Sequence, residues 1–122
     1  MAGYVDGFVL PVSKGKLGAY RKLCVMMGKM MRKYGALDYY ECVGDDLAAK
    51  WGCVPFPKMA GAKAGETVVF SFITYKNKAH RNAVTAKMMK DPMMNDPKNK
   101  DKSMPFEMKR MAAGGFKVLY KM

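Results

Sequence analysis

The feature that most constrains the fold is a segment near the N-terminus that is apolar on both faces of a β-strand. Residues 4–12 read Tyr-Val-Asp-Gly-Phe-Val-Leu-Pro-Val, so alternate positions place apolar side chains on either side. A strand of this kind needs cover on both faces. A chain of 122 residues is expected to form one domain, residues 1–122, with helices to cover one face. We expect a partner chain to cover the other.

Four predicted strands and two predicted helices follow one another along the chain. Apolar residues three or four apart define each helix, and β-branched or aromatic runs define the strands. Ser13 and Asn77 are predicted to cap the two helices, and Gly18 and Gly28 to let the first helix approach the sheet. The elements are a strand near residues 3–12, a helix over Lys14–Tyr34, strands over Ala36–Val43 and Glu66–Tyr75, a helix over Lys78–Lys90 and a strand over Phe116–Met122.

The connections between these elements are predicted from their glycine, proline and lysine content. Leu47–Gly65 and Met93–Met104 are predicted as irregular loops, and Pro105–Met111 as a short helical turn or the lead into the last strand. Gly114 and Gly115 favour a bend or bulge. The element order β-α-β-β-α-β is the ferredoxin-like pattern, an α+β fold with a four-stranded antiparallel sheet and both helices on one face.

This arrangement leaves Tyr, Phe, Val and Ile side chains on the sheet face away from the helices. The bare area would exceed the few hundred Å² of contiguous apolar surface that a monomer usually exposes. A two-fold homodimer, with the sheets of two protomers facing each other, is the simplest way to cover it.

Short motifs along nearly the whole chain resemble those of a known family. They include Tyr4–Val9, Gly35–Leu37, Val68–Phe72, Lys87–Met93 and Gly114–Phe116. In this order they resemble the YbaA-like bacterial family of unknown function. The resemblance implies a dimeric α+β barrel, in which two ferredoxin-like protomers turn their sheets toward each other. Members of the wider superfamily include oxygenases, haem-degrading enzymes, isomerases and ligand sensors, with pockets between helices and sheet. A shared fold does not by itself assign one of these functions.

The charge balance raises the question of an anionic partner. The chain has 22 basic and 10 acidic residues, a net charge of +12, and the predicted first helix contains seven basic residues and no acidic one. Such an excess favours contact with polyanions, and it also fits a protein with lysine-rich helix faces. The basic stripe lacks the interleaved aromatic residues of single-strand binders and a recognition-helix arrangement.

The cysteines and the lengths of the apolar runs predict where in the cell the protein is found. Cys24, Cys42 and Cys53 are an odd number without a closely spaced pair, which predicts reduced thiols. We see no secretory signal, and no stretch approaches the roughly 18 uninterrupted apolar residues of a membrane span. We therefore expect a cytoplasmic protein without membrane association.

Asp6 is the first candidate for a functional side chain. A carboxylate in an apolar central strand is costly unless it is paired or hydrogen-bonded. The first strand lies beside the last in the ferredoxin-like order, so Lys109 or Arg110 is within its reach. Asp6 is then a base or ligand anchor in a pocket, or else a structural ion pair or a strand-end carboxylate reaching water. We favour the structural interpretation.

The other candidates are isolated residues rather than motifs. Glu41, with Tyr39 nearby, suits proton transfer. Alternatively, Glu41 lines a solvent-exposed rim or pairs with a residue of the other protomer of the dimer. His80 is the only histidine, and a lone histidine is no metal signature; it is a solvated helix residue or, by analogy with haem-degrading relatives, an axial ligand. Trp51 lines a pocket or anchors its loop, and Arg110 is a ligand-binding candidate with Asp6.

Two functions from different classes remain. The sequence favours a small molecule, bound or converted in a helix–sheet pocket of a dimeric barrel. The alternative is a basic binding module for nucleic acid or another anionic partner. No phosphate loop, dinucleotide fingerprint, nucleophile elbow or metalloprotease motif occurs. We expect no cofactor and no metal, and the sequence leaves open whether the protein is an enzyme.

Overall fold

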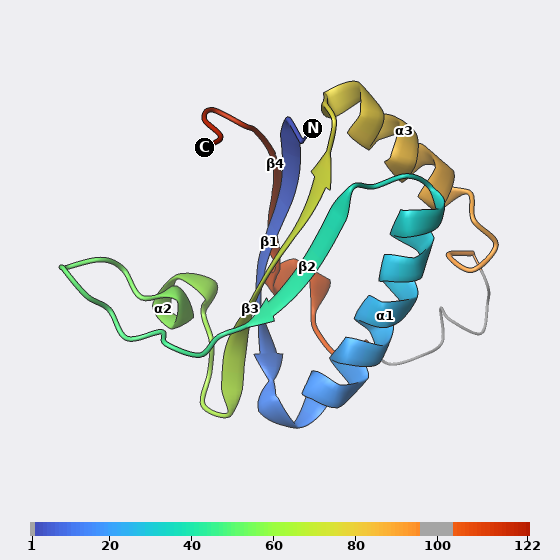
Figure 1. The fold of residues 1–122 in the computed structure, drawn as a ribbon. Helices are drawn as coiled ribbons and strands as arrows, with labels where there is room; N and C mark the ends of the chain where they lie inside the picture. Colours follow the sequence, from blue (N-terminus) through green and yellow to red (C-terminus); the bar gives the residue numbers. More distant parts are fainter. Residues whose placement is uncertain (1, 96–103) are drawn as a thin grey trace.

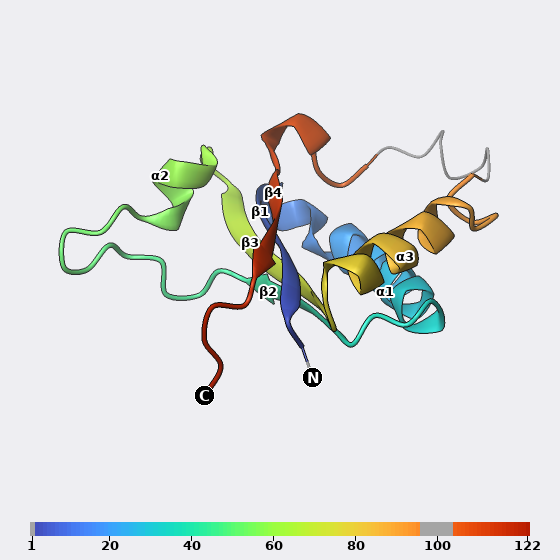
Figure 2. The same cartoon turned by 90° about the horizontal axis from the view of Figure 1, so that it is seen from above.

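A computed structural model describes residues 2–95 and 104–122. Its four strands form one antiparallel sheet in the order β2-β3-β1-β4, the ferredoxin-like topology that the sequence predicts (Figure 1). The bounds are β1 Tyr4–Ser13, α1 Leu17–Lys33, β2 Asp38–Val43, α2 Phe56–Ala60, β3 Glu66–Tyr75, α3 Lys78–Met89 and β4 Ala112–Lys117. Helices α1 and α3 cover one face of the sheet, and α2 lies on the other side (Figure 2).

The two predicted helix caps have different outcomes. The Asn77 side chain accepts a hydrogen bond from the His80 backbone N–H at 2.8 Å, so the predicted cap of α3 is confirmed. The Ser13 side chain makes no capping bond, because a 3₁₀ turn over Lys14–Lys16 stands between the strand and α1. Gly35 follows the end of α1 with φ +101°, the left-handed conformation that ends many helices.

The core lies between the sheet and the two helices and consists of two clusters. One joins Tyr4, Ile73 and Tyr75 of the sheet to buried residues of both helices, among them Met30, Met31, Val84 and Met88. The other joins Leu10, Val12 and Val69 to Tyr20 of α1. Even-numbered residues of β1 and odd-numbered residues of β3 therefore face the helices, as the register Tyr4↔Tyr75 requires.

The last strand begins and ends earlier than predicted. β4 runs over Ala112–Lys117 and pairs with β1 from Val9↔Ala112 to Tyr4↔Lys117, whereas the sequence placed it over Phe116–Met122. Gly114 and Gly115 pair in continuous register and form no bulge. A Cβ on Gly115 would lie 2.9 Å from ring carbons of Tyr4, so this glycine gives room to the tyrosine.

Two predicted connections also differ from the structure. The segment Leu47–Gly65 is not wholly irregular, because it contains α2, which Pro55 precedes and Gly61 ends with φ +65°. A 3₁₀ turn over Met108–Arg110 lies in the region where a short helical turn is predicted. Most of the predicted loop Met93–Met104 lies outside the described residues. Within residues 2–95 and 104–122, no helix has both the length and the apolar character that membrane crossing requires.

The sheet face away from α1 and α3 carries large apolar side chains, and we call it the open face. Tyr40, Phe70 and Phe116 belong to it and are 55%, 45% and 62% exposed. The Tyr40 and Phe72 rings stack at 5.0 Å, and the Phe70 and Phe72 rings lie 5.9 Å apart. Exposed aromatic side chains of this size on one sheet indicate a surface that associates with another molecule.

Candidate functional site

The candidate site is built around the carboxylate of Glu41, between β2 and α1. The Tyr20 hydroxyl donates a hydrogen bond to Glu41 Oε1 at 2.8 Å, and the Tyr39 hydroxyl donates to Glu41 Oε2. The thiol of Cys24 lies near these three side chains. We call Tyr20, Cys24, Tyr39 and Glu41 the Glu41 cluster.

Strand alternation and helix periodicity bring these residues together. Tyr39 and Glu41 are two positions apart on β2 and lie opposite Ile73 and Ser71 of β3, on the face that the helices cover. Tyr20 and Cys24 are four positions apart on α1 and so share one side of the helix. β2 is an edge strand, and Glu41 is partly exposed, so solvent reaches the cluster from the sheet edge.

A glycine allows α1 and β2 to approach closely at this point. A Cβ on Gly28 would lie 3.3 Å from the Tyr39 ring, which is tighter than an ordinary contact. The predicted role of Gly28 is therefore confirmed. The same prediction for Gly18 is wrong, because no atom lies within 4 Å of the position its Cβ would take.

The electrostatics of the cluster keep its phenols and thiol protonated. Burial, and then the hydrogen bond to Glu41, raise the pKa of both Tyr20 and Tyr39. Burial also raises the pKa of the Cys24 thiol. The cluster thus presents two phenolic donors beside one carboxylate acceptor, an arrangement that suits proton transfer to or from a bound hydroxyl or carbonyl group.

Asp6 forms an ion pair, but with a different partner from the one predicted. The Arg81 guanidinium of α3 lies 3.2 Å from Asp6 Oδ1 and donates to the Tyr4 hydroxyl at 3.1 Å. Its carbon lies 5.0 Å from the Tyr4 ring centre, a cation–π contact. Burial raises the pKa of Asp6, while Arg81 and a hydrogen bond with Tyr75 act in the opposite direction. Its own burial, and then the nearby charge of Asp6, raise the pKa of Tyr75 to about 12.

Arg110, one of the predicted partners of Asp6, lies at the other end of the sheet. Its guanidinium makes two hydrogen bonds to Glu66, at 2.7 and 2.8 Å, and a third to the Gly61 carbonyl at 2.9 Å. It therefore ties the turn after α2 to the start of β3. Arg110 lowers the pKa of Glu66 to about 2. Glu66 occupies its guanidinium, so Arg110 and Asp6 do not share a site.

His80 and Trp51 lie apart from the Glu41 cluster. His80 Nδ1 accepts a hydrogen bond from the Lys76 backbone N–H at 3.0 Å, and its ring packs edge-on against Tyr75. In the described part of the chain, no group of three or more His, Cys, Asp and Glu side chains is placed to hold a metal. Trp51 has φ +56° and is 94% exposed, so it does not anchor its loop by burial.

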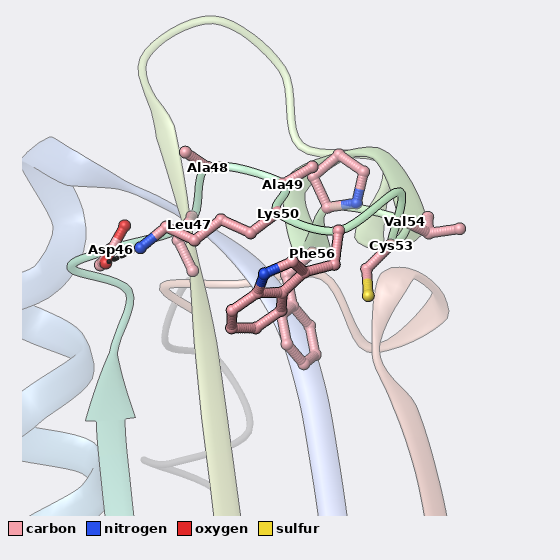
Figure 3. Close-up of a pocket in the computed structure, with 10 residues that line it drawn as sticks. Asp46, Leu47, Ala48, Ala49, Lys50, Cys53, Val54 and Phe56 are labelled. Atoms are coloured by element: carbon pink, nitrogen blue, oxygen red, sulfur yellow. Dashed lines mark hydrogen bonds and ion pairs between the residues drawn. The ribbon is translucent and has the colours of Figure 1, made fainter.

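The loop that carries Trp51 encloses a small cavity of its own. The cavity measures about 240 Å³ and is lined by residues of the segment 46–56, with Lys50 and Asp46 paired at 3.2 Å on its rim (Figure 3). Its labelled lining residues include Leu47, Val54 and Phe56, and its polar groups are few (Figure 3). Neither Asp6 nor Glu41 lines this cavity, and Trp51 is the one candidate residue among its lining residues.

Sequence reasoning found half of the Glu41 cluster and missed Tyr20, Cys24 and the role of Arg81. Tyr20 and Cys24 fit the spacing of three or four residues that defines the predicted first helix, so in the sequence they look like ordinary core positions. The signal that could have found them is their spacing of four residues, together with Tyr39 and Glu41 alternating on the same face of the next strand.

Comparisons with known proteins bear on the fold and the family. The model of a family described as "Protein of unknown function (DUF1428)" matches residues 3–108. The uncharacterized protein YbaA of Escherichia coli strain K12 is 43% identical over 117 residues, which are 95% of this chain and 96% of YbaA. YbaA of Shigella flexneri matches to the same extent.

Two solved structures share the fold at low sequence identity. One is a dimeric ferredoxin-like protein from an uncultured marine organism, with a TM-score of 0.59, 13% identity and coverage of 98% of this chain and 99% of that chain. The other is a monooxygenase from the gene ActVA-Orf6 of Streptomyces coelicolor, in complex with the ligand Nanaomycin D. Its TM-score is 0.60, with 14% identity and coverage of 99% and 91%. These likenesses confirm the ferredoxin-like fold of the dimeric α+β barrel class.

Proposed function

The chain belongs to the DUF1428 family of proteins of unknown function, and from this premise we propose that it is a homodimeric barrel that binds a small molecule at the Glu41 cluster. The ligand we propose is a small aromatic compound with an acidic phenol or enol group. The observation that carries this proposal is the Glu41 carboxylate, held between the hydroxyls of Tyr20 and Tyr39 at the helix–sheet interface.

The chemistry of the cluster defines the ligand and the conversion. The proton of a bound phenol or enol moves to a Glu41 oxygen, which leaves a neutral carboxyl group and a ligand oxyanion. Tyr20 and Tyr39 remain protonated, and their hydroxyls turn from the neutralised Glu41 to donate hydrogen bonds to that oxyanion, as donors do in many active sites. Tyr20 packs edge-on against Phe106 with ring centres 5.7 Å apart, so aromatic surface borders the cluster.

The homodimer is supported by the open face and by the C-terminal residues. Leu119 and Tyr120, which follow β4, are 100% and 81% exposed, and the open face exposes the aromatic rings described above. Two such faces brought together by a two-fold axis would cover each other. One of the solved structures with this fold is described as a dimeric ferredoxin-like protein.

The test uses 4-nitrophenol as the acidic probe and its methyl ether, 4-nitroanisole, as the neutral analogue. We expect saturable binding of 4-nitrophenol to the full chain, with a change in its absorbance as the hydroxyl contacts Glu41, and weaker binding of 4-nitroanisole. Glu41→Gln should weaken 4-nitrophenol binding by about tenfold to a hundredfold, because a hydrogen bond to a charged group contributes about 1.5–3 kcal/mol.

The matched control is Asp46→Asn, which removes an exposed carboxylate of the loop after β2 and should leave binding unchanged. Both variants are compared at equal folded fraction, judged by thermal unfolding. Equal affinities of wild type and Glu41→Gln, or equal binding of the phenol and its ether, would refute the site.

A further inference from the structure

A second cavity lies on the outer side of α1, away from the Glu41 cluster. It measures about 580 Å³, within the size range of small-molecule sites. It runs between α1 and the turn after α3 that contains Asp91 and Pro92. We propose that this groove binds a fatty-acid-like amphiphile, with an apolar chain or ring and one anionic head.

The charges of the groove favour an anionic head. Lys22, Lys29 and Lys33 line it, and they lie seven and four positions apart on one side of α1. Lys33 Nζ lies 3.5 Å from the buried Asp91 carboxylate, the one acidic group among the lining residues that the structure describes. Among the residues that the structure describes, neither Lys22 nor Lys29 has a carboxylate partner, so the groove carries an excess of positive charge.

The Asp91 carboxylate at the groove already has its partners within the protein. Asp91 accepts hydrogen bonds from the Tyr34 hydroxyl and from the Met93 backbone N–H, in addition to its ion pair with Lys33. Its side chain is 6% exposed. Asp91 therefore holds the turn against α1 and leaves the ammonium groups of Lys22 and Lys29 available to a ligand.

The floor of the groove is apolar and adaptable. Val25 is 44% exposed there, and the other apolar lining residues are Met26, Met30, Pro92 and Met93. Methionine side chains are flexible and polarizable, so they accommodate apolar groups of differing shape. Among the described residues, no aromatic side chain lines the groove, whereas proteins that bind single-stranded nucleic acid stack bases on aromatic rings.

The methionines also provide the test. The chain has 14 methionines, and ¹³C-methyl labelling makes each one visible by NMR, with assignment by single Met→Leu replacements. We expect added octanoate to shift the signals of Met26 and Met30 in a saturable manner and to leave Met59, on α2, unchanged. The neutral analogue 1-octanol should bind more weakly.

Three variants locate the head and the chain of the ligand. Lys22→Gln and Lys29→Gln should each raise the octanoate dissociation constant by up to about fivefold, the effect of one exposed charge pair. Val25→Glu places a carboxylate on the floor and should abolish the shifts. Lys87→Gln, on the exposed side of α3, is the control and should change nothing.

Several outcomes would overturn this proposal. They are equal binding of octanoate and 1-octanol, unchanged affinity in both lysine variants and in Val25→Glu, and absence of saturable shifts. If the protein co-sediments with phosphatidylglycerol vesicles while octanoate leaves the methionine signals unshifted, the groove binds a membrane surface instead of a free amphiphile. Because 4-nitrophenol binding at Glu41 is measured separately, failure of either site is distinguishable from failure of the other.

Discussion

Replacing Arg81 with methionine tests whether the ion pair with Asp6 is structural. The Asp6 and Arg81 side chains are only 13% and 24% exposed, so the variant leaves a mostly buried carboxylate without its cation. Breaking a fully buried pair costs about 3–5 kcal/mol. Because both groups keep some contact with water, we expect Arg81→Met to lower the free energy of unfolding by about 2–3 kcal/mol at pH 7.

The pH dependence of this loss has a definite sign. Burial raises the pKa of Asp6, and Arg81 is the main influence that opposes the rise. Without Arg81 the pKa in the folded state rises further, so the protonated carboxyl favours the fold. That contribution is fully present below the unfolded pKa near 3.8 and is lost as pH rises through the folded pKa. The variant should therefore be closest to wild type in acid and furthest from it at neutral pH.

The assay is urea unfolding at several pH values and at one fixed protein concentration, because the stability of an oligomer depends on concentration. Arg21→Met, which removes an exposed arginine from α1, is the control and should lie within about 0.5 kcal/mol of wild type. The double variant Asp6→Asn/Arg81→Met should lose less free energy of unfolding than the two single variants lose together, by at least about 1 kcal/mol. An Arg81→Met protein as stable as wild type at pH 7, with a parallel pH curve, would refute this reasoning.

Two further predictions concern β4 and the second ion pair. Gly115→Ala should lower the free energy of unfolding in urea by about 1–3 kcal/mol, because its Cβ would overlap the Tyr4 ring. Gly114→Ala, whose Cβ would lie 3.7 Å from its nearest neighbour, should lower it by less than about 1 kcal/mol. Equal losses in the two variants would contradict the close approach of Tyr4 to Gly115. The lowered pKa of Glu66, about 2, means that its contribution to stability is present above pH 4.5 and is lost as pH falls toward 2. Arg110→Gln should flatten the acid limb of the stability curve between these values, and an unchanged acid limb would contradict the assignment.

The sequence was sufficient for the element order and for the sheet topology because the signals are strong and local. A β-strand that is apolar on both faces occurs in the middle of a covered sheet, and β1 and β3 are the two central strands. The apolar stripe of the first helix and the asparagine cap of the second placed both helices within a few residues of their observed bounds.

The position of the last strand was missed because its residues have weak strand propensity. β4 contains Gly114 and Gly115, which usually mark a bulge or a bend. They belong to the strand because tertiary contact decides here: the hydroxyl and ring of Tyr4 need the space that a side chain on Gly115 would fill. No local pattern shows which aromatic residue of a neighbouring strand requires a glycine.

The candidate site was found only in part for a similar reason. Tyr39 and Glu41 are two positions apart in the sequence, so alternation along a strand places them on one face. Their partners Tyr20 and Cys24 come from α1 and look like ordinary core positions. Asp6 was expected to pair within the sheet, because strand order can be inferred from the fold class. The partner is Arg81 of α3, and the direction of a helix side chain toward a given strand residue is set by packing that the sequence does not show.

The most direct test of the central claim, that a second copy covers the open face, is sedimentation equilibrium of the full chain. The account predicts a mass of twice the 13.6 kDa of one chain at micromolar concentration. Phe70→Glu, which places a charge on the open face, should give the mass of one chain with the helices retained, and Met108→Glu, at an exposed position in the 3₁₀ turn, should remain a dimer. A wild-type mass of 13.6 kDa across the concentration range, or an unchanged dimer in Phe70→Glu, would contradict it.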